Sequence, residues 1–230
     1  MCTVVIDVST PTRLLAVRDE DPQREWDDMG AWWPEHYPGV TGIRDRRAGG
    51  AWLALDPATR RLAVLLNRAD VLDLPASEVV SRGGLVLESV VGRSPEPPLR
   101  THGFNLLEVS PEHARVLSWD GVELTETPVV DGVHMIAHDG LDDPATARIA
   151  TWLPRFRAER PAPDDPDWSA RWLELLAESG ELSPEDDRAI IRDNHVHGYP
   201  TMSLLYCIAA VSDAGAVARS YTLARPGQWG

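Results

Sequence analysis

Two short apolar runs at the start of the chain constrain its fold more than any other feature. Residues 3–6 read Thr-Val-Val-Ile, and residues 14–17 read Leu-Leu-Ala-Val. Both runs predict buried strands, and the Pro-containing turn between them predicts that they pair as a hairpin. The return strand would then bring Arg18 and Asp19 back to the beginning of the chain, near Cys2.

Cys2 directly follows the initiator methionine, and methionine aminopeptidases remove Met before small residues. Removal would leave a thiol and a free α-amine on one residue. The reference pKa of an α-amine is about 7.7–8.0, so much of it is neutral at mildly alkaline pH. A neutral amine can accept the proton of the thiol, which makes Cys2 a candidate nucleophile with its own base.

Arg18 and Asp19 are candidate partners of this nucleophile. We expect Arg18 to hold the thiolate and to lower the pKa of the thiol, because a nearby cation favours the thiolate. Asp19 would orient the α-amine through a charge-assisted hydrogen bond. The alternative is that Arg18 and Asp19 belong to a surface salt bridge at a strand end.

Asn67 and Asn105 are candidate donors to an oxyanion. They are two of three asparagines in the chain, and both lie near ends of predicted strands. An amide NH₂ directed at developing negative charge is what acyl transfer requires. Asn67 is the better candidate, because Asn105 could instead satisfy polar groups inside the sheet.

Several motifs, in this order, resemble the NRDE family, also called the transport-and-Golgi-organisation-two family. They are Met-Cys-Thr-Val-Val at the start, Leu-Leu-Ala-Val-Arg-Asp-Glu at 14–20, Gly-Gly-Ala-Trp-Leu-Ala at 49–54, Ala-Val-Leu-Leu-Asn-Arg at 63–68, Ser-Arg-Gly at 81–83 and Gly-Phe-Asn-Leu-Leu at 103–107. Members of that family resemble N-terminal-nucleophile (Ntn) hydrolases. The resemblance implies an α+β fold, an αββα sandwich of two antiparallel sheets flanked by helices.

Two functions remain, the first from the chemistry of the residues named above and the second mainly from the resemblance. In the first, the protein hydrolyses a non-peptide C–N (amide) bond with Cys2 as the nucleophile. In the second, the fold serves a non-catalytic carrier or trafficking protein for haem or a lipid-like ligand.

Two positions depart from the family pattern. The signature Asn is replaced by Val17, and the family's Tyr-Gly-Thr-Arg-Ser near the tail corresponds to residues 197–203, His-Gly-Tyr-Pro-Thr-Met-Ser, which lack an arginine. If that arginine binds a substrate carboxylate or stabilises charge, this protein handles a different ligand or none.

The rest of the chain predicts one domain over residues 1–230 with a helical insertion at about 143–193. Strands are expected at 51–55, 61–67, 104–109, 114–119, 133–137, 203–211 and 216–221. Helices are expected at 77–91, after Asp143-Pro144, around Trp172 and at 184–192. Residues 19–28 and 44–50 are expected to be irregular or turn-rich.

Nine tryptophans are many for 230 residues. Trp32, Trp33 and Trp52 are candidates for the wall or lid of a ligand pocket, since indole rings offer large contact areas at low entropic cost. The alternative for the segment around Trp32 and Trp33 is a loop pinned by its aromatic residues.

Charge restricts the partners. With 36 acidic and 22 basic residues the formal net charge is −14, which argues against nucleic acid and anionic membranes as partners. All the basic residues are arginine, so Schiff-base lysines, phosphate-binding lysines and Ser-Lys dyads are excluded. A small-molecule ligand or substrate remains as the expected partner, and the sequence does not indicate an oligomeric state.

Two cysteines, Cys2 and Cys207, argue against a disulfide framework and for a reducing compartment. No apolar run has the length of a membrane span, so we predict a cytoplasmic protein. We predict no cofactor and no metal: His195 and His197 would point the same way on a strand, but no third ligand accompanies them. Haem held non-covalently by one of seven histidines stays open.

Overall fold

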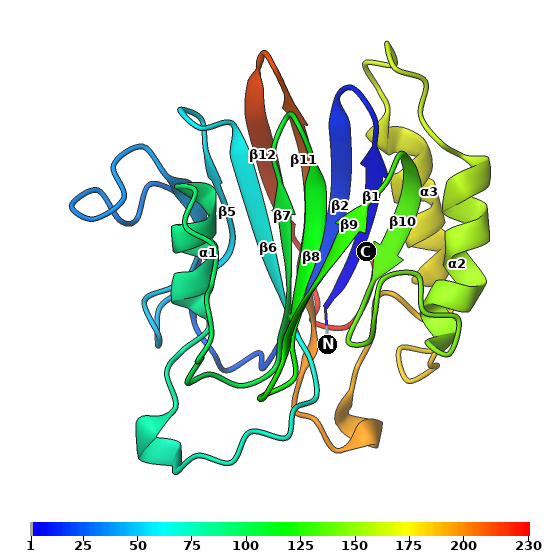
Figure 1. The fold of residues 1–230 in the computed structure, drawn as a ribbon. Coiled ribbons are helices and arrows are strands. Elements are labelled where there is room, and N and C mark those ends of the chain that lie inside the picture. The colour runs from blue at the N-terminus through cyan, green and yellow to red at the C-terminus, as the bar shows by residue number, and fades with distance from the viewer. Residues whose placement is uncertain (1) are drawn as a thin grey trace. The chain divides into compact units, whose positions relative to one another are not determined.

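Twelve strands form two antiparallel sheets in the computed structural model, which describes residues 2–230 (Figure 1). The five-stranded sheet has the order β10-β1-β2-β11-β12, and the seven-stranded sheet runs from β3 to β9 in chain order. The strands are β1 Thr3–Val8, β2 Thr12–Glu20, β3 Trp26–Gly30, β4 Thr41–Asp45, β5 Ala51–Asp56, β6 Arg61–Asn67, β7 Phe104–Val109, β8 Ala114–Trp119, β9 Leu124–Val129, β10 Gly132–Ile136, β11 Met202–Ser212 and β12 Gly215–Thr222.

Contacts between residues divide the chain into two units. The first unit contains the chain through Gln23, Asp131–Ala209 and Arg219–Gly230, and it holds most of the five-stranded sheet. The second unit contains Arg24–Val130 and Ala210–Ala218, and it holds the seven-stranded sheet. The predicted class, α+β with two antiparallel sheets and helices, is confirmed. One domain with a helical insertion stays a prediction.

The predicted N-terminal hairpin is confirmed. Strands β1 and β2 pair antiparallel with Thr3 opposite Val17 and Ile6 opposite Leu14. On its other side β1 pairs with β10, so it is an interior strand of its sheet. Its apolar residues are buried on both faces, as the continuous β-branched run predicted.

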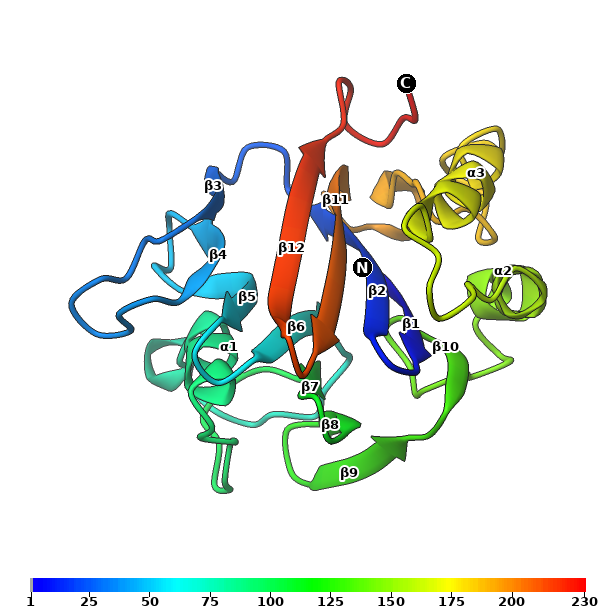
Figure 2. The ribbon, with the colours of Figure 1, turned by 90° about the horizontal axis from the view of Figure 1, so that it is seen from above.

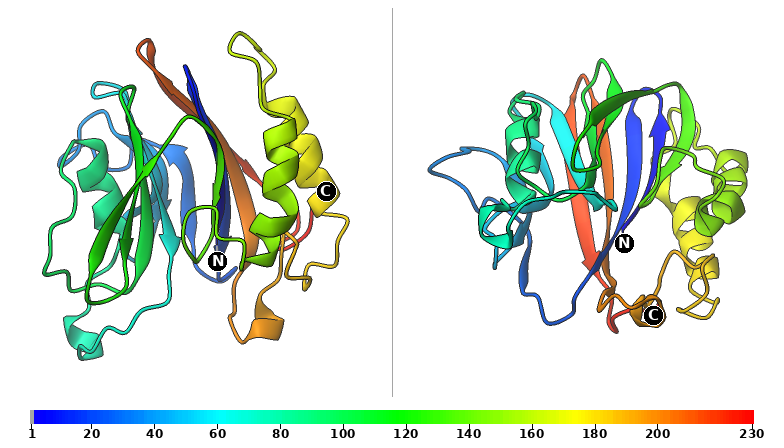
Figure 3. Two further views of the ribbon diagram at one scale, coloured as in Figure 1. Left: turned by 45° about the vertical axis from the view of Figure 1, so that its right-hand side comes forward. Right: turned by 60° about the horizontal axis from the view of Figure 1, so that its bottom comes forward.

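Helices α2 (Ala147–Ala158) and α3 (Ser169–Ser179) lie next to each other in the first unit, as Figures 2 and 3 show. Their apolar stripes contain Ile149, Trp152 and Phe156 on α2 and Trp172 on α3, and they share one buried cluster with apolar residues of β1, β2 and β10. Burial of these side chains, not helix propensity, is the main source of stability for helices of this length.

The third helix predicted at 184–192 is wrong. This segment forms turns because its end is bonded to other elements. The backbone N–H of Ile190 donates to Ser179 Oγ at 2.6 Å, and that of Arg192 donates to Ser203 Oγ at 3.0 Å. Ile190 and Ile191 join the buried cluster, so tertiary contacts override the local helix signals.

In the second unit, helix α1 (Gly83–Val90) packs against β5 and β6 (Figure 1). The helix predicted at 77–91 is therefore shorter than expected, and a separate 3₁₀ turn spans Ala76–Glu78. An added Cβ at Gly83 would lie 2.9 Å from Gly50 Cα. This close approach of two backbones sets the start of the helix.

The irregular segments predicted at 19–28 and 44–50 are wrong in part, because β2 runs on to Glu20 and β3 and β4 form around them. Asp27 on β3 accepts hydrogen bonds from Arg44 Nε and Arg46 Nε, both at 2.6 Å. Strands β3 and β4 pair antiparallel through their backbones, and Asp27 adds charged pairs where an apolar pattern would have marked the strands in the sequence.

Candidate active site

Cys2 lies at the start of β1 and is 5% exposed. Its thiol donates to the backbone oxygen of Asp19 at a distance of 3.7 Å. The prediction that the hairpin brings Arg18 and Asp19 back to Cys2 is confirmed. Both residues are buried at the end of β2. Arg18 Nη2 pairs with Glu20 Oε2 at 3.4 Å, so the ion pair of the alternative is present for Arg18, but it is not at the surface.

The Asp19 carboxylate is held by two side chains from far along the chain. Ser203 Oγ donates to Asp19 Oδ1 at 2.7 Å, and Asn194 Nδ2 donates to Oδ2 at 3.4 Å. Asn194 and Ser203 are fully buried. A buried carboxylate fixed by hydrogen bonds is an orienting group for a neighbouring cation or amine.

Two further arginines complete this cluster. Arg148 lies in the first turn of α2 and donates from Nη1 to Thr3 Oγ1 at 2.9 Å. Arg192 lies in the segment between α3 and β11, and its backbone N–H reaches Ser203 Oγ. Both are buried. The start of β1 and the segment before β11 lie at the same end of the first unit in both views of Figure 3.

Sequence reasoning missed Arg148, Arg192, Asn194 and Ser203. One signal was available for Arg148, because it lies on the apolar stripe of α2, four residues before Trp152. An arginine in such a stripe must be buried and must have polar partners, which makes it a candidate residue of a functional site. No comparable local signal existed for the other three.

Burial dominates the electrostatics of the cluster. It raises the pKa of the Cys2 thiol, and the negative charge of Asp19 acts in the same direction. Arg18 lowers this pKa, as expected, but its effect is smaller than that of burial. Burial, together with the charge of Arg192, lowers the pKa of Arg148 to about 10.

A family model described as Transport and Golgi organisation 2 matches residues 1–158. The chain belongs to this family. The match confirms the family predicted from the motifs. A search of curated proteins found no match.

The family match contains part of the cluster. Cys2, Arg18, Asp19 and Arg148 lie inside the matched region, whereas Arg192, Asn194 and Ser203 follow it. In this member of the Transport and Golgi organisation 2 family, the Asp19 carboxylate lies inside the matched region, and Asn194 and Ser203, which bond to it, lie outside that region.

The two predicted oxyanion donors lie in the second unit of this family member. Asn67 is exposed at the end of β6. Asn105 is fully buried in β7, where its Oδ1 accepts a hydrogen bond from Ser118 Oγ at 2.7 Å. This contact supports the alternative given for Asn105, a polar group satisfied inside the sheet. The oxyanion role of either residue stays a prediction.

The three candidate tryptophans of the pocket wall also lie in the second unit. Trp52 is a buried residue of β5. Trp33 Nε1 donates to the Gly49 oxygen at 2.6 Å, and the Arg44 guanidinium lies 4.9 Å from the ring centroid of Trp32. These contacts support the alternative of a segment pinned by its aromatic residues. Their ligand role stays a prediction.

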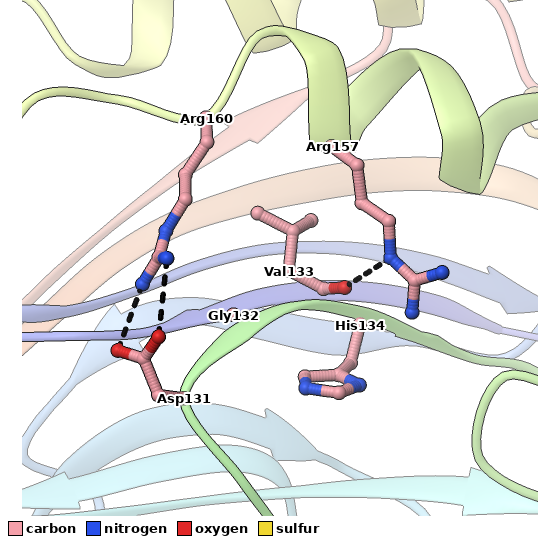
Figure 4. Close-up of a pocket in the computed structure, with 6 residues that line it drawn as sticks. All are labelled: Asp131, Gly132, Val133, His134, Arg157 and Arg160. Atoms are coloured by element: carbon pink, nitrogen blue, oxygen red, sulfur yellow. Dashed lines mark hydrogen bonds and ion pairs between the residues drawn. The ribbon is translucent and has the colours of Figure 1, made fainter.

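A shallow pocket of about 340 Å³ lies elsewhere in the first unit, between β10 and the end of α2 (Figure 4). Its lining contains Asp131, His134, Arg157 and Arg160, and none of the residues around Cys2. Arg160 pairs with Asp131 at 3.0 Å, and Arg157 donates to the Val133 oxygen at 3.0 Å. Because its polar groups satisfy one another, this pocket is the poorer candidate for a reactive site.

His195 and His197 lie in a 3₁₀ turn, not on a strand, so the shared direction that a strand would give them does not apply. Within residues 2–230, no group of three or more His, Cys, Asp or Glu side chains is placed to hold a metal ion. No helix in the same residues is long and apolar enough to cross a membrane.

Proposed function

We propose that this protein is an Ntn-type hydrolase that cleaves a non-peptide amide bond with Cys2 as its nucleophile, after removal of Met1. The carrying observation is the buried Asp19 carboxylate beside Cys2, fixed by Ser203 and Asn194. Met1 lies outside the described residues, so its removal is part of the proposal.

The raised pKa of the buried thiol supports the need for a base. In the proposed reaction the neutral α-amine of Cys2 takes the thiol proton, and the thiolate attacks the carbonyl carbon of the amide. The resulting ammonium gives its proton to the leaving nitrogen as the C–N bond breaks, which leaves a thioester on Cys2. Water, deprotonated by the same amine, then hydrolyses the thioester and restores the thiol.

The partners of Cys2 have separate tasks in this proposal. Asp19 would orient the α-amine and stabilise it as the ammonium. The buried guanidinium of Arg18 would stabilise negative charge on the sulfur. Asn67, with Asn105 as the second choice, stays the predicted donor to the oxyanion.

The first test is the intact mass of protein purified without an N-terminal tag, before and after treatment with a thiol reagent. We expect a mass without Met1 and one fast label, which Cys2→Ala abolishes. Hydrolysis in an amide panel should fall to background in Cys2→Ala, a loss of at least about a thousandfold. Cys207→Ala, which changes a buried thiol in β11, is the matched control and should keep the activity.

A mass that retains Met1 would block the α-amine and end the Ntn mechanism. The alternative function, a carrier of haem or a lipid-like ligand, would then become the working hypothesis. Binding of haem or acyl ligands, measured by quenching of tryptophan fluorescence, would test it.

A further inference from the structure

Arg192 is a buried cation whose hydrogen-bonding capacity is incompletely used. Its side chain is 2% exposed, and its ion pair joins Nη2 to Asp187 Oδ1 at 3.4 Å. The Asp187 side chain is 67% exposed, so solvent screens this pair. Within residues 2–230, the buried Nε of Arg192 meets no acceptor. A buried guanidinium donor without an acceptor is costly, which calls for an explanation.

The surroundings of Arg192 add positive charge. Arg148 is close enough to Arg192 for the charge of Arg192 to lower the pKa of Arg148. The pKa of His138 is lowered mainly by burial, and the charges of Arg148 and Arg192 lower it further. The buried carboxylate of Asp19 already accepts hydrogen bonds from Ser203 and Asn194. The cluster therefore combines adjacent buried cations with a carboxylate that is already engaged.

The pocket on β10 offers a comparison within the same unit. There Arg160 pairs with Asp7 at 2.8 Å and with Asp131 at 3.0 Å, and Arg157 pairs with Asp142 at 2.8 Å. These arginines have carboxylates of the chain at short range. Arg192 has a longer pair to an exposed carboxylate, although it is the more deeply buried residue.

Arg192 is also connected to the nucleophile. Its backbone N–H donates to Ser203 Oγ, and that hydroxyl donates to Asp19 Oδ1. The charge of the Cys2 thiolate in turn acts on neighbouring Arg148. An anion bound by Arg192 would thus lie in the same buried cluster as the reacting thiol.

We propose that the substrate is an amide that carries a carboxylate, and that Arg192 binds this carboxylate with the charge of Arg148 in support. The inference rests on the proposed hydrolase function and names its substrate class. A guanidinium presents paired N–H donors that match a carboxylate, and it remains protonated when buried.

Two alkylating reagents of nearly equal size test this without knowledge of the substrate. Iodoacetate and iodoacetamide both lose iodide to the Cys2 thiolate and form a thioether, but only iodoacetate carries a carboxylate. At Cys2 we divide the rate constant for iodoacetate by the rate constant for iodoacetamide. We compare this ratio with the same ratio for the free peptide Cys-Thr-Val-Val. The ratio should be about tenfold higher, or more, in the folded protein.

Arg192→Met should return the ratio to that of the peptide, and Arg192→Lys should keep part of the preference. Arg171→Met removes the same charge from an exposed position on α3 and should leave the ratio unchanged. A wild-type ratio equal to the peptide value overturns the inference while the hydrolase proposal stands, since iodoacetamide still labels Cys2. Failure of both reagents to label Cys2 in the folded protein would overturn both proposals.

Discussion

The thiol of Cys2 gives the most direct pH test at the scale of a residue. Burial raises its pKa above the ordinary 9.0, with the Asp19 charge acting in the same direction. The thiolate is therefore the minor form at neutral pH when no base accepts its proton. In protein with an N-terminal extension, we expect the labelling rate to rise about tenfold per pH unit from pH 6 to beyond 9.

Protein without Met1 should behave differently, because its α-amine titrates at about 8. Its labelling rate should level off near that pH instead of continuing to rise. Quenching the labelling reaction at set times, followed by mass spectrometry, measures the pH profile of the labelling rate for both forms. Equal profiles for the two forms would show that the α-amine does not act as the base.

Arg148 allows a prediction about stability. Its pKa, lowered from 12.5 to about 10, shows that the folded state disfavours the charged guanidinium relative to the unfolded chain. Burial and the charge of Arg192 outweigh the attraction of Asp19 and of the Cys2 thiolate. Arg148→Met should therefore raise the free energy of unfolding, by an amount on the order of 1 kcal/mol, while labelling of Cys2 by iodoacetate slows.

Thermal unfolding of the variant and the wild type at pH 7 checks this. Arg155→Met, on the exposed side of the same helix, should change the free energy of unfolding by no more than about 0.5 kcal/mol. A lower melting temperature for Arg148→Met would mean that the guanidinium is matched by its surroundings.

Only the local part of the site could be predicted from sequence. Cys2, Arg18 and Asp19 are brought together by one hairpin, whose register follows from alternating strand geometry and a short turn. Asn194 and Ser203 reach Asp19 from 175 and 184 residues away, and no periodicity encodes such a meeting. The third asparagine, Asn194, carries no such signal, because its segment is rich in turns and has no regular pattern.

At the scale of elements, the start of α1 offers a matched pair of substitutions. A Cβ added at Gly83 would meet backbone atoms of Gly50 at 2.9 Å and of Ala51 at 3.1 Å, whereas one added at Gly84 would meet nothing within 4 Å. Gly84→Ala should stabilise the protein by about 0.5–1 kcal/mol through helix propensity. Gly83→Ala should destabilise it despite the same propensity gain, because β5 and the helix must separate.

Chemical denaturation of the two variants beside the wild type measures both effects. If Gly83→Ala stabilised the protein, the backbone at Gly50 and Ala51 would have to move away from the added Cβ without loss of stability.

The elements that the sequence predicted and those it missed differ in what holds them. Strands with continuous apolar runs, such as β5, β6 and β7, were predicted close to their observed bounds. Strands β3 and β4 were missed because Asp27 adds charged pairs where an apolar pattern would have marked them. The segment before β11 was predicted as a helix because its N-terminal signals are local, and hydrogen bonds to Ser179 and Ser203 outweigh them.

At the scale of the molecule, the family match ends before the first unit is complete. Residues 1–158 include β1, β2, β10 and α2 but lack α3, β11 and β12. Without β11, strand β2 has an unpaired edge, and the buried cluster loses Trp172, Ile190 and Ile191. A fragment of residues 1–158 should therefore aggregate or remain unfolded.

Size-exclusion chromatography and circular dichroism of the fragment and the full chain test this prediction. A monomeric fragment with a cooperative thermal transition would contradict it.

The long separation between Asp19 and its partners also sets an order of events during synthesis. A ribosome needs roughly 10–40 s to add the 184 residues between Asp19 and Ser203. Until then, the β11 side of β2 is open, and the first residues of the chain are not yet enclosed by the segment before β11. The proposed removal of Met1 would therefore have to take place on the growing chain, because the completed fold buries Cys2. Under the proposed function, a molecule would therefore acquire its nucleophile before its last strands are made, and one that folded before the cleavage would stay inactive.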